Sequence, residues 1–257
     1  MSILRGLFGR TKRSKVLDFQ NKLAFLEVDM HNHILPAIDD GADTLEHSYL
    51  LIRGLQTLGI HKFICTPHID KYTDQTVLTK IDEAYHRLQD YVQQQESEVI
   101  FTYGAEYLVN KAFNQYLEQP SLRALPGGYV LIEQSYKKES KHLFGVIERI
   151  QQLGFKPVLA HPERYAYYHG DFDVFSKIKD AGCLLQLNIL SVSSYYGVSV
   201  KRTGAHLMKK GMYDFVGTDV HHERHILALQ EVLNRYDMAD LLRSCNILNP
   251  SLQDYLS

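Results

Sequence analysis

Cysteine is scarce in this sequence of 257 residues, and its scarcity excludes several kinds of chemistry. The three cysteines, Cys65, Cys183 and Cys245, are odd in number, and none stands in CxxC spacing. This pattern argues against a disulfide framework and a thiolate zinc site, and it favours a reducing compartment. No arginine stands six positions after a cysteine, so phosphatase chemistry of the Cys-x5-Arg type is also excluded. Cys65 and Cys183 lie within apolar segments and are predicted to be buried thiols.

Long apolar runs and a strong net charge are absent as well. No uninterrupted apolar stretch approaches the ~20 residues that are needed to span a bilayer. The formal net charge of -2 disfavours a nucleic-acid partner. We therefore expect a cytoplasmic protein that does not bind nucleic acid, and the oligomeric state is left open.

The first 22 residues are predicted to form a basic tail outside the folded domain. This segment has neither the long apolar core nor the small-residue cleavage site of a secretory signal. One interpretation is a solvated terminal segment. The other is a weak peripheral contact with the inner face of the membrane, made by Leu4, Leu7 and Phe8 and the surrounding basic residues.

Residues 23–257 alternate between apolar strand-like runs and helix-like segments, which is typical of βα units around a parallel sheet. Seven strands are predicted, at 24–30, 62–65, 99–105, 129–132, 157–160, 184–189 and 214–217. The fold class expected is therefore α/β, as a single domain with a distorted, seven-stranded TIM-like (β/α)7 barrel, one strand short of the usual eight. Asp43 or Thr44 is expected to cap the helix that follows the first strand.

The strand-like runs share one property: most of them end on an imidazole or a carboxylate. Such side chains meet at the carboxyl-terminal rim of a parallel barrel, where active sites of this fold lie. The candidate metal ligands are His31, His33, Asp40, His68, Glu106, Glu133, His161, Asp219 and His221. Imidazoles mixed with carboxylates suit Mn²⁺, Fe²⁺ or Zn²⁺, with Mg²⁺ as a further candidate.

Alternatives remain open for single members of this set. A lone His-x-His pair, such as His31 and His33, is weak evidence for a metal site. Glu106 and Glu133 could each form a salt bridge with an arginine at the rim, because a buried carboxylate needs a partner of opposite charge. The recurrence of ligand types at equivalent strand ends favours a multinuclear metal site, with Glu106 as the better candidate for a bridging carboxylate.

Two arginines are the best-placed anion binders, because a guanidinium can bind two oxygens of a phosphate at once. They are Arg164 in His-Pro-Glu-Arg and Arg224 in His-His-Glu-Arg. Each could instead pair with its neighbour, Glu163 or Glu223. Asn188 ends the sixth predicted strand and could orient substrate or hold a loop.

The remaining histidines are not assigned to the metal site. Most of them are predicted to lie on the surface of helices, helix ends or loops: His47, His61, His86, His142, His169, His206 and His225. His222 directly follows His221 and should therefore point elsewhere. It is kept as a candidate proton donor.

Taken together, these motifs resemble the PHP (polymerase and histidinol phosphatase) superfamily. More closely, they resemble its bacterial tyrosine-protein phosphatases of capsular and exopolysaccharide synthesis, the CpsB/CapC type. The resemblance runs over about residues 26–235, on the motifs VDMHNHILPAIDDG (28–41), TPH (66–68), GAE (104–106), LIE (131–133), AHPER (160–164) and GTDVH (217–221).

The resemblance implies a site with up to three divalent ions, usually manganese. One ion would be held by His31, His33, Glu106 and Asp219, a second by Glu106, Glu133 and His161, and a third by Asp40, His68 and His221. The phosphate-binding arginine of the family falls on Arg164. Its second arginine lies somewhat further past the last histidine than Arg224 does.

The activity implied by the resemblance is hydrolysis of phosphotyrosine by in-line attack of a metal-bound hydroxide on phosphorus. The implied partner is the phosphotyrosine tail of a membrane-associated bacterial tyrosine autokinase that controls capsular and exopolysaccharide synthesis. Two alternatives stay open. The same site could hydrolyse a small phosphate ester such as histidinol phosphate, or the barrel could dock on a kinase without catalysis. Lys71, Lys137, Lys138 and Tyr136 suggest an open, basic approach, which favours a protein substrate.

Overall fold

The computed structural model describes residues 19–70, 76–117 and 122–256. Most of the predicted tail, residues 1–18, and the predicted cation Lys71 lie outside the described residues. Among the residues that the structure describes, no helix combines the length and the apolarity of a membrane-spanning segment. Cys65 and Cys183 are free and buried, as predicted.

All paired strands run parallel, which confirms the α/β class. The strands are β1 (Val28–Asp29), β2 (Lys62–Cys65), β3 (His68–Ile69), β4 (Ile100–Tyr103), β5 (Glu106–Leu108), β6 (Tyr129–Glu133), β7 (Lys156–Ala160), β8 (Leu184–Asn188) and β9 (Phe215–Gly217). They form one sheet in the order β1-β2-β4 and another in the order β3-β5-β6-β7-β8-β9. Parallel neighbours require crossover connections, and helices supply most of them.

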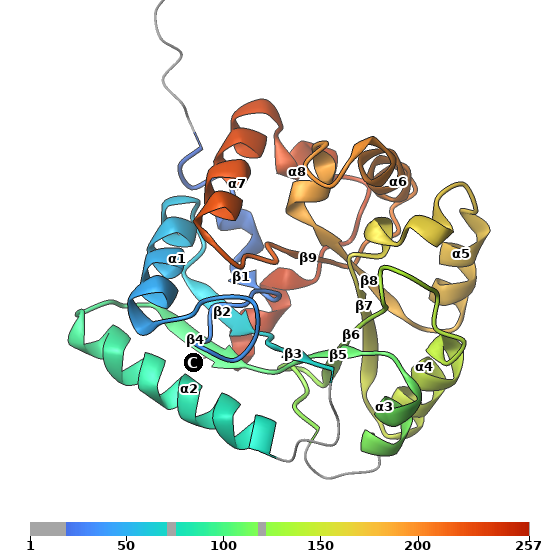
Figure 1. Ribbon diagram of the computed structural model, residues 1–257. Coiled ribbons are helices and arrows are strands. Elements are labelled where there is room, and N and C mark those ends of the chain that lie inside the picture. The colour runs from blue at the N-terminus through green and yellow to red at the C-terminus, as the bar shows by residue number, and fades with distance from the viewer. Residues whose placement is uncertain (1–18, 71–75, 118–121, 257) are drawn as a thin grey trace, which may run out of the picture.

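The helices lie around the outside of the strands (Figure 1). The α-helices are α1 (Leu45–Thr57), α2 (Thr76–Gln94), α3 (Lys111–Tyr116), α4 (Leu143–Gln152), α5 (Asp173–Asp180), α6 (Val198–Lys209), α7 (Glu223–Arg235) and α8 (Met238–Leu241). The 3-10 helices are η1 (Ala24–Leu26), η2 (Pro162–Arg164), η3 (Ala166–Tyr168), η4 (Ile189–Val192) and η5 (Asn249–Tyr255). Of the two proposed caps of α1, Thr44 is the one used: its hydroxyl accepts from the amide of His47 at 3.1 Å.

The described residues contain nine short strands rather than the seven expected. The strand predicted at 99–105 ends at Tyr103, and a new strand, β5, starts at Glu106. Likewise, β2 stops at Cys65 and β3 starts at His68, after Pro67. The breaks let Gly104 donate to the carbonyl of Cys65 and Glu106 donate to that of Pro67. They also set His68 and Glu106 side by side as register partners.

The first predicted strand is also shorter than expected. Residues 24–26 form η1 instead, and Glu27 has a φ of 60°, so an extended conformation begins only at Val28. This left-handed residue interrupts the strand that the apolar pattern of 24–30 suggested.

The first and last strands are joined by specific bonds rather than by a regular ladder. The amide of Asp219 donates to the carbonyl of His31 at 2.8 Å, and that of His33 donates to Val220 at 3.0 Å. Below these bonds, the buried carboxylate of Asp29 accepts from the amide and the hydroxyl of Thr218, at 3.0 and 2.6 Å. Asn249 of η5 lies between the same strands and bonds to the backbone of both Val28 and Val216.

Side chains of successive strand residues enter two separate cores, because they point to opposite faces. In β6, Leu131 belongs to an inner core, and Val130 and Ile132 pack outward against the helices. Leu252 and Leu256 near the C-terminus belong to the same inner core as Leu131. Several of the buried polar side chains, among them His31, Glu106 and Asp219, lie beyond this inner core at the carboxyl ends of the strands.

We predict that Asp29→Ala lowers the free energy of unfolding by about 3 kcal/mol, because several buried donors on Thr218 and Asn32 lose their acceptor. The measurement is urea unfolding at neutral pH. The control is Glu27→Gln at an exposed site two residues away, which should change stability by less than about 0.5 kcal/mol. A loss below about 1 kcal/mol for Asp29→Ala would contradict the role given to Asp29 in joining the first and last strands.

Candidate metal centre

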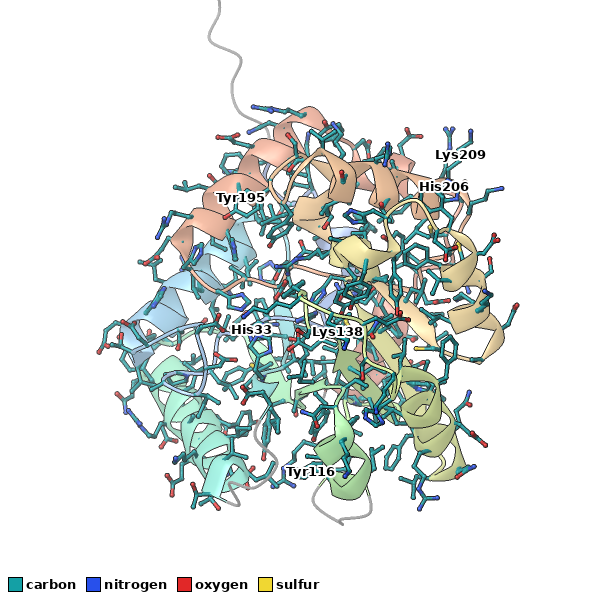
Figure 2. The ribbon with its side chains drawn as sticks, turned by 45° about the vertical axis from the view of Figure 1, so that its right-hand side comes forward. His33, Tyr116, Lys138, Tyr195, His206 and Lys209 are labelled. Atoms are coloured by element: carbon teal, nitrogen blue, oxygen red, sulfur yellow. The ribbon has the colours of Figure 1, made fainter. Side chains whose placement is uncertain are left out.

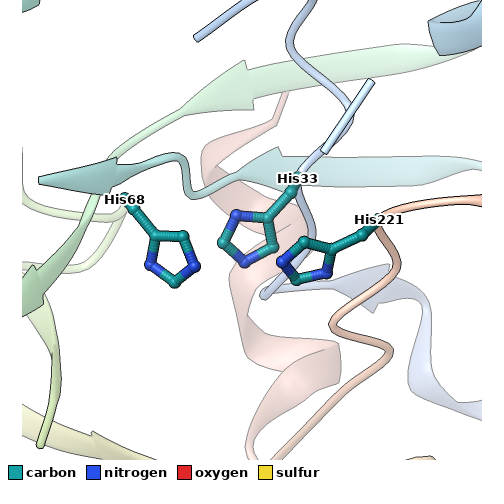
Figure 3. Close-up of side chains that lie close together, drawn as sticks. All are labelled: His33, His68 and His221. Carbon is teal, nitrogen blue, oxygen red and sulfur yellow. The ribbon is translucent and has the colours of Figure 1, made fainter. Parts of the chain in front are cut away.

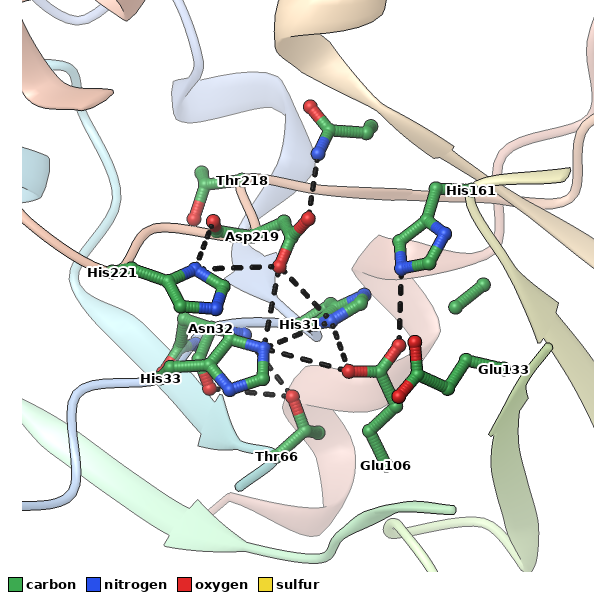
Figure 4. Close-up of polar contacts among 12 residues, drawn as sticks. His31, Asn32, His33, Thr66, Glu106, Glu133, His161, Thr218, Asp219 and His221 are labelled. Carbon is green, nitrogen blue, oxygen red and sulfur yellow. Dashed lines mark hydrogen bonds and ion pairs between the residues drawn. The ribbon is translucent and has the colours of Figure 1, made fainter. Parts of the chain in front are cut away.

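Eight of the nine predicted ligands converge at the carboxyl ends of the strands, and the ninth, Asp40, lies at the edge of the same cluster. Figure 4 shows all of them except His68 and Asp40. Five of them are almost fully buried: His31, His33, Glu106, His161 and Asp219. His68 and His221 are partly buried, and the side chain of Asp40 is 77% exposed. The cluster is therefore sealed on its inner side and open toward Asp40.

Four side-chain atoms meet with the spacing of a metal coordination shell. They are Nε2 of His31, Nε2 of His33, Oε2 of Glu106 and Oδ1 of Asp219. The separations that involve a histidine nitrogen lie between 3.2 and 3.5 Å. Ligands about 2.1 Å from a tetrahedral ion would lie about 3.4 Å apart, so this set fits a divalent ion without rearrangement.

Glu106 extends the cluster toward a second group. Its other oxygen, Oε1, lies 3.1 Å from Nε2 of His161. Nδ1 of His68 lies 3.1 Å from Oε2 of Glu106 and 3.2 Å from Oε1 of Glu133. The carboxylate of Glu106 thus faces both groups, as a bridging ligand would. His68 thus approaches the ligands of the second ion, although the family resemblance implied that it would hold the third ion.

The third set is also brought together, more loosely. Nε2 of His68 and Nε2 of His221 lie 3.7 and 3.5 Å from Oδ1 of Asp40. The rings of His68 and His221 flank that of His33 (Figure 3), with centroid distances of 4.4 and 4.0 Å. Because Asp40 is exposed, this group lies at the solvent side of the centre.

Protonated imidazoles balance the buried carboxylates when no cation lies between them. Burial alone would raise the pKa of Glu106, but the charges of His31 and His68 lower it well below its usual range. Burial would lower the pKa of His68, whereas the charge of Glu106 raises it to about 12. The same competition, with Asp39 as the main partner, raises the pKa of His33 to about 10. The cluster is thus built to hold positive charge.

Within the described residues, three buried atoms of the candidate ligands also make no hydrogen bond of normal geometry, namely Oε2 of Glu106, Nδ1 of His68 and Nδ1 of His161. An orphaned carboxylate oxygen surrounded by ring nitrogens is expensive unless a cation occupies the space between them. The donor set therefore fits divalent ions with oxygen and nitrogen preferences.

Three of the histidines are oriented through Nδ1, two of them by side chains that the sequence did not single out as site residues, Gln186 and Asp39. Oε1 of Gln186 lies 2.9 Å from Nδ1 of His31, and Oδ2 of Asp39 lies 2.7 Å from Nδ1 of His33. The carbonyl of Asp219 lies 2.9 Å from Nδ1 of His221. Such contacts fix a ring so that Nε2 faces the metal. A buried glutamine within an otherwise apolar strand was the available signal for Gln186.

Two of the candidate ligands have a strained backbone conformation. His161 has a φ of 33° and Asp219 a φ of 52°, in the left-handed region that side chains rarely adopt. His161 directly follows β7, and Asp219 lies two residues after the end of β9, where the chain leaves the sheet. Strain of this kind persists where the surroundings enforce it, and it is common at functional sites.

Arg164 lies against the cluster rather than beside Glu163. Its Nη1 donates to Oδ2 of Asp219 at 2.7 Å, and its guanidinium lies 4.6 and 4.1 Å from the ring centroids of Tyr136 and Tyr196. The pairing with Glu163 that the sequence left open is not formed. Glu163 instead accepts from Tyr213. Arg164 is thus held flat between two aromatic faces, with one donor used by a candidate ligand.

Asn188 also contacts Asp219. Its Nδ2 donates to Oδ2 of Asp219 at 2.8 Å, and its Oδ1 accepts from the amide of Leu190. Of the two roles left open for this residue, the observed contacts are those of a residue that holds a loop and a ligand.

The second predicted arginine is not brought to the cluster. Arg224 is exposed at the start of α7, and no hydrogen bond or ion pair within the described chain joins it to a candidate ligand. His222 precedes this helix and lies near His225, with ring centroids 4.0 Å apart. His225 is buried, contrary to the surface position expected, and its Nδ1 accepts from the amide of His221.

A cavity of about 480 Å³ opens beside the cluster. His68, Asp40 and Glu133 form its polar side, and Ile38 and Leu108 supply apolar walls. A further part of the lining comes from Tyr136 and Lys137, which the sequence predicted to face the approach. This cavity can take an aromatic group whose anionic end reaches the metal ligands.

Comparison with known proteins gives a consistent set of relatives. A family model described as "Capsular polysaccharide synthesis, CpsB/CapC" matches residues 27–235. Tyrosine-protein phosphatase CpsB of Streptococcus pneumoniae is 26% identical over 201 residues, which cover 76% of this chain and 83% of the relative. Tyrosine-protein phosphatase YwqE of Bacillus subtilis is 26% identical over 196 residues, with coverage of 76% and 77%.

Solved structures support the fold. A structure described for YwqE from Bacillus subtilis and CpsB from Streptococcus pneumoniae, "unique metal-dependent tyrosine phosphatases", matches with a TM-score of 0.71 and 24% identity. The match covers 86% of this chain and 96% of the other. An amidohydrolase from Mycoplasma synoviae matches with a TM-score of 0.55 and 13% identity, with coverage of 88% and 87%.

We predict that divalent ions stabilise the chelator-treated protein and that Glu106→Gln removes most of this effect. An ion at 100 times its dissociation constant contributes about 2.7 kcal/mol, which for a chain of this size raises Tm by about 5–10 °C. Thermal unfolding with and without Mn²⁺ is the measurement. The exposed control Glu83→Gln should keep the full shift. An equal shift in Glu106→Gln would contradict the assignment of Glu106 as the shared ligand.

Proposed function

The chain belongs to the CpsB/CapC family of capsular polysaccharide synthesis, and from this premise we propose that it is a metal-dependent phosphotyrosine-protein phosphatase. One observation carries the proposal. Four ligand atoms, from His31, His33, Glu106 and Asp219, stand at coordination spacing, and Arg164 lies against the last of them. A cation centre beside a fixed guanidinium suits a phosphoryl group, which carries charge on several oxygens.

We propose Mn²⁺ as the native metal, with Fe, Zn or Mg as alternatives. The ligand sets proposed are His31, His33, Glu106 and Asp219 for one ion, Glu106, Glu133 and His161 for a second, and Asp40, His68 and His221 for a third. The approach of Nδ1 of His68 to Glu106 and Glu133 supports a contribution of His68 to the second set as well. Bound ions would supply Lewis acidity, which makes water nucleophilic at neutral pH and stabilises phosphoryl charge.

Arg164 is proposed to bind the phosphoryl oxygens. Only one of its donors is used by Asp219, and the flanking rings of Tyr136 and Tyr196 hold its plane, so the remaining donors are available to an anion. The apolar walls at Ile38 and Leu108 suit the tyrosyl ring. A tyrosyl leaving group has a pKa of ~10 and needs little help from a general acid. The proposed reaction therefore needs no strong general acid, and His222 is not required as a proton donor.

The proposed substrate is the phosphotyrosine tail of a membrane-associated tyrosine autokinase, and the proposed location is cytoplasmic. Residues 1–22 are proposed to be a basic tail with weak peripheral contact at the inner face of the membrane, and residues 23–257 a single domain. The bonds between the first and last strands and the two cores support a single cooperative unit for residues 23–257.

We expect the full-length protein, loaded with Mn²⁺, to release phosphate from a phosphotyrosine peptide. The kcat/KM for this peptide should exceed that for histidinol phosphate by at least about tenfold, because the open cavity offers apolar contact to the aromatic ring. His31→Ala and Asp219→Ala should abolish turnover while the far-UV spectrum is retained. A folded, metal-loaded protein without turnover of either ester would refute the phosphatase assignment in favour of a docking function. A preference for histidinol phosphate would refute the substrate class.

A pair of arginine variants tests which guanidinium binds the phosphoryl group. Arg164→Ala should lower kcat/KM by about 10²- to 10³-fold, the usual loss for a group that stabilises transition-state charge. Arg224→Ala is the matched control and should stay within about twofold, because its side chain is exposed and apart from the cluster. Steady-state kinetics on a phosphotyrosine peptide measure both. Equal losses would show that Arg224 reaches the substrate.

A further inference from the structure

A second cavity, of about 380 Å³, adjoins the one beside the metal centre. We call it the lysine groove and define it by Asn110, Lys111, Lys138, Ser140, Lys141 and His142. Ser135 lines both cavities. Leu108 of the first cavity is also followed directly by Val109 of the second. Because Ser135 lines both, the two cavities adjoin each other along the β6–α4 loop and the segment after β5, and we call the pair the trough.

The two parts of this trough carry opposite charge. The catalytic cavity is lined by carboxylates, including Asp39, Asp40 and Glu133, which face the metal centre. The lysine groove presents three exposed lysines, and within the described residues none of them forms an ion pair. Its one carboxylate, Glu139, accepts a hydrogen bond from Tyr168 at 3.0 Å. Among the residues that the structure describes, the charges of these three lysines are therefore not taken up by an ion pair.

The groove is built on a fixed loop rather than on free side chains. Gln134 is fully buried, and its Oε1 accepts from the amide of Ser140 at 3.0 Å. Its Nε2 donates to Tyr168 at 2.9 Å. The hydroxyl of Tyr167 donates to the carbonyl of Ser135 at 3.1 Å. These contacts hold both ends of the 135–140 segment in place, so the lysines start from a defined position.

We propose that the lysine groove binds an acidic segment of the substrate chain, with Asp or Glu side chains near the phosphotyrosine. This inference rests on the proposed phosphatase function and names the sequence context that it selects. A peptide that places its phosphotyrosine in the catalytic cavity must leave that cavity, and the trough offers a path past Ser135. Complementary charge then favours acidic neighbours.

The residue types favour carboxylates over a second phosphate. Arginine is the side chain that binds phosphate with two parallel donors, and the catalytic cavity has Arg164 beside it for that purpose. The described lining of the lysine groove has lysines and a histidine but no arginine. Lysines act as point charges with little demand on direction, which suits the carboxylates of an extended peptide.

The test uses two peptides with one phosphotyrosine, flanked either by Glu and Asp or by Gln and Asn. For the Mn²⁺-loaded full-length protein, kcat/KM should be about 5- to 10-fold higher for the acidic peptide at low ionic strength, and the ratio should fall toward 1 as salt screens the charges. Lys138→Gln combined with Lys141→Gln should bring the ratio below about 2 at low salt.

The matched control is Lys177→Gln combined with Lys209→Gln, two exposed lysines on α5 and α6. In the view of Figure 2, Lys209 lies at the outer edge of the molecule and Lys138 near the middle of the face that is shown. This control should keep the full ratio. Turnover of a small aryl phosphate, which does not extend along the trough, reports the state of the catalytic cavity in every variant.

Equal kcat/KM for both peptides in the unaltered protein would overturn the inference, and so would an acidic preference that survives the Lys138 and Lys141 changes. A doubly phosphorylated peptide that outperforms the acidic peptide through the same lysines would also overturn it, in favour of a phosphate site. If neither peptide nor the aryl phosphate is hydrolysed, the proposed function itself fails. The two failures are therefore distinguishable.

Discussion

The buried carboxylate of Glu106 is the constraint on which the rest of the rim depends. It is fully removed from solvent, and the nitrogens of four histidines surround its two oxygens at 3.1 to 3.5 Å. A carboxylate in this position is tolerated only with positive charge beside it, either on the imidazoles or on a metal ion. The four imidazoles come from three separate parts of the chain, at His31 and His33, at His68 and at His161, so the fold must bring several strand ends to one point to satisfy a single side chain.

The irregular parts of the sheet follow from that requirement. A regular continuation of β2 and β4 would carry the chain past the centre, whereas the breaks before β3 and β5 restart the strands with His68 and Glu106 as neighbours. The strained backbone at His161 and Asp219 has the same consequence at other strand ends. Between the first and last strands, Asp29 and Asn249 replace ladder bonds with side-chain bonds. The strands thus lose regular backbone hydrogen bonds where the candidate ligands converge, and buried polar side chains supply replacement hydrogen bonds.

The sequence allowed the converging side chains to be identified as candidate ligands because their signal is local. Each follows an apolar run, and the carboxyl ends of parallel strands meet by geometry alone. The supporting residues could not be found in this way, because their partners are remote in the chain: Gln186 contacts His31 across 155 positions, and Asn249 contacts Val28 across 221. The same applies to Arg164, whose neighbour Glu163 was the obvious partner in sequence and whose actual partner, Asp219, lies 55 positions away. The break between β4 and β5 was missed because Gly104-Ala105 extends an apolar run that reads as continuous, whereas the end of β2 at Cys65 was predicted and only the two-residue strand β3 was not.

The segment after β6 has two separate roles. It holds Glu133 beside the other candidate ligands, and it carries the exposed lysines. Glu133 ends the strand and faces the metal ligands, Gln134 is buried and bonded on both sides, and the following residues carry the lysines outward. Because Gln134 anchors the loop independently of the cations beyond it, the exposed lysines can change without moving Glu133. A change in the substrate sequence that is selected therefore need not disturb the ligands, since exposed charges contribute little to stability and act mainly on association. The buried centre can thus keep its ligands fixed while the exposed loop changes its charges. The same reaction can then act on substrates with different sequences around the phosphotyrosine.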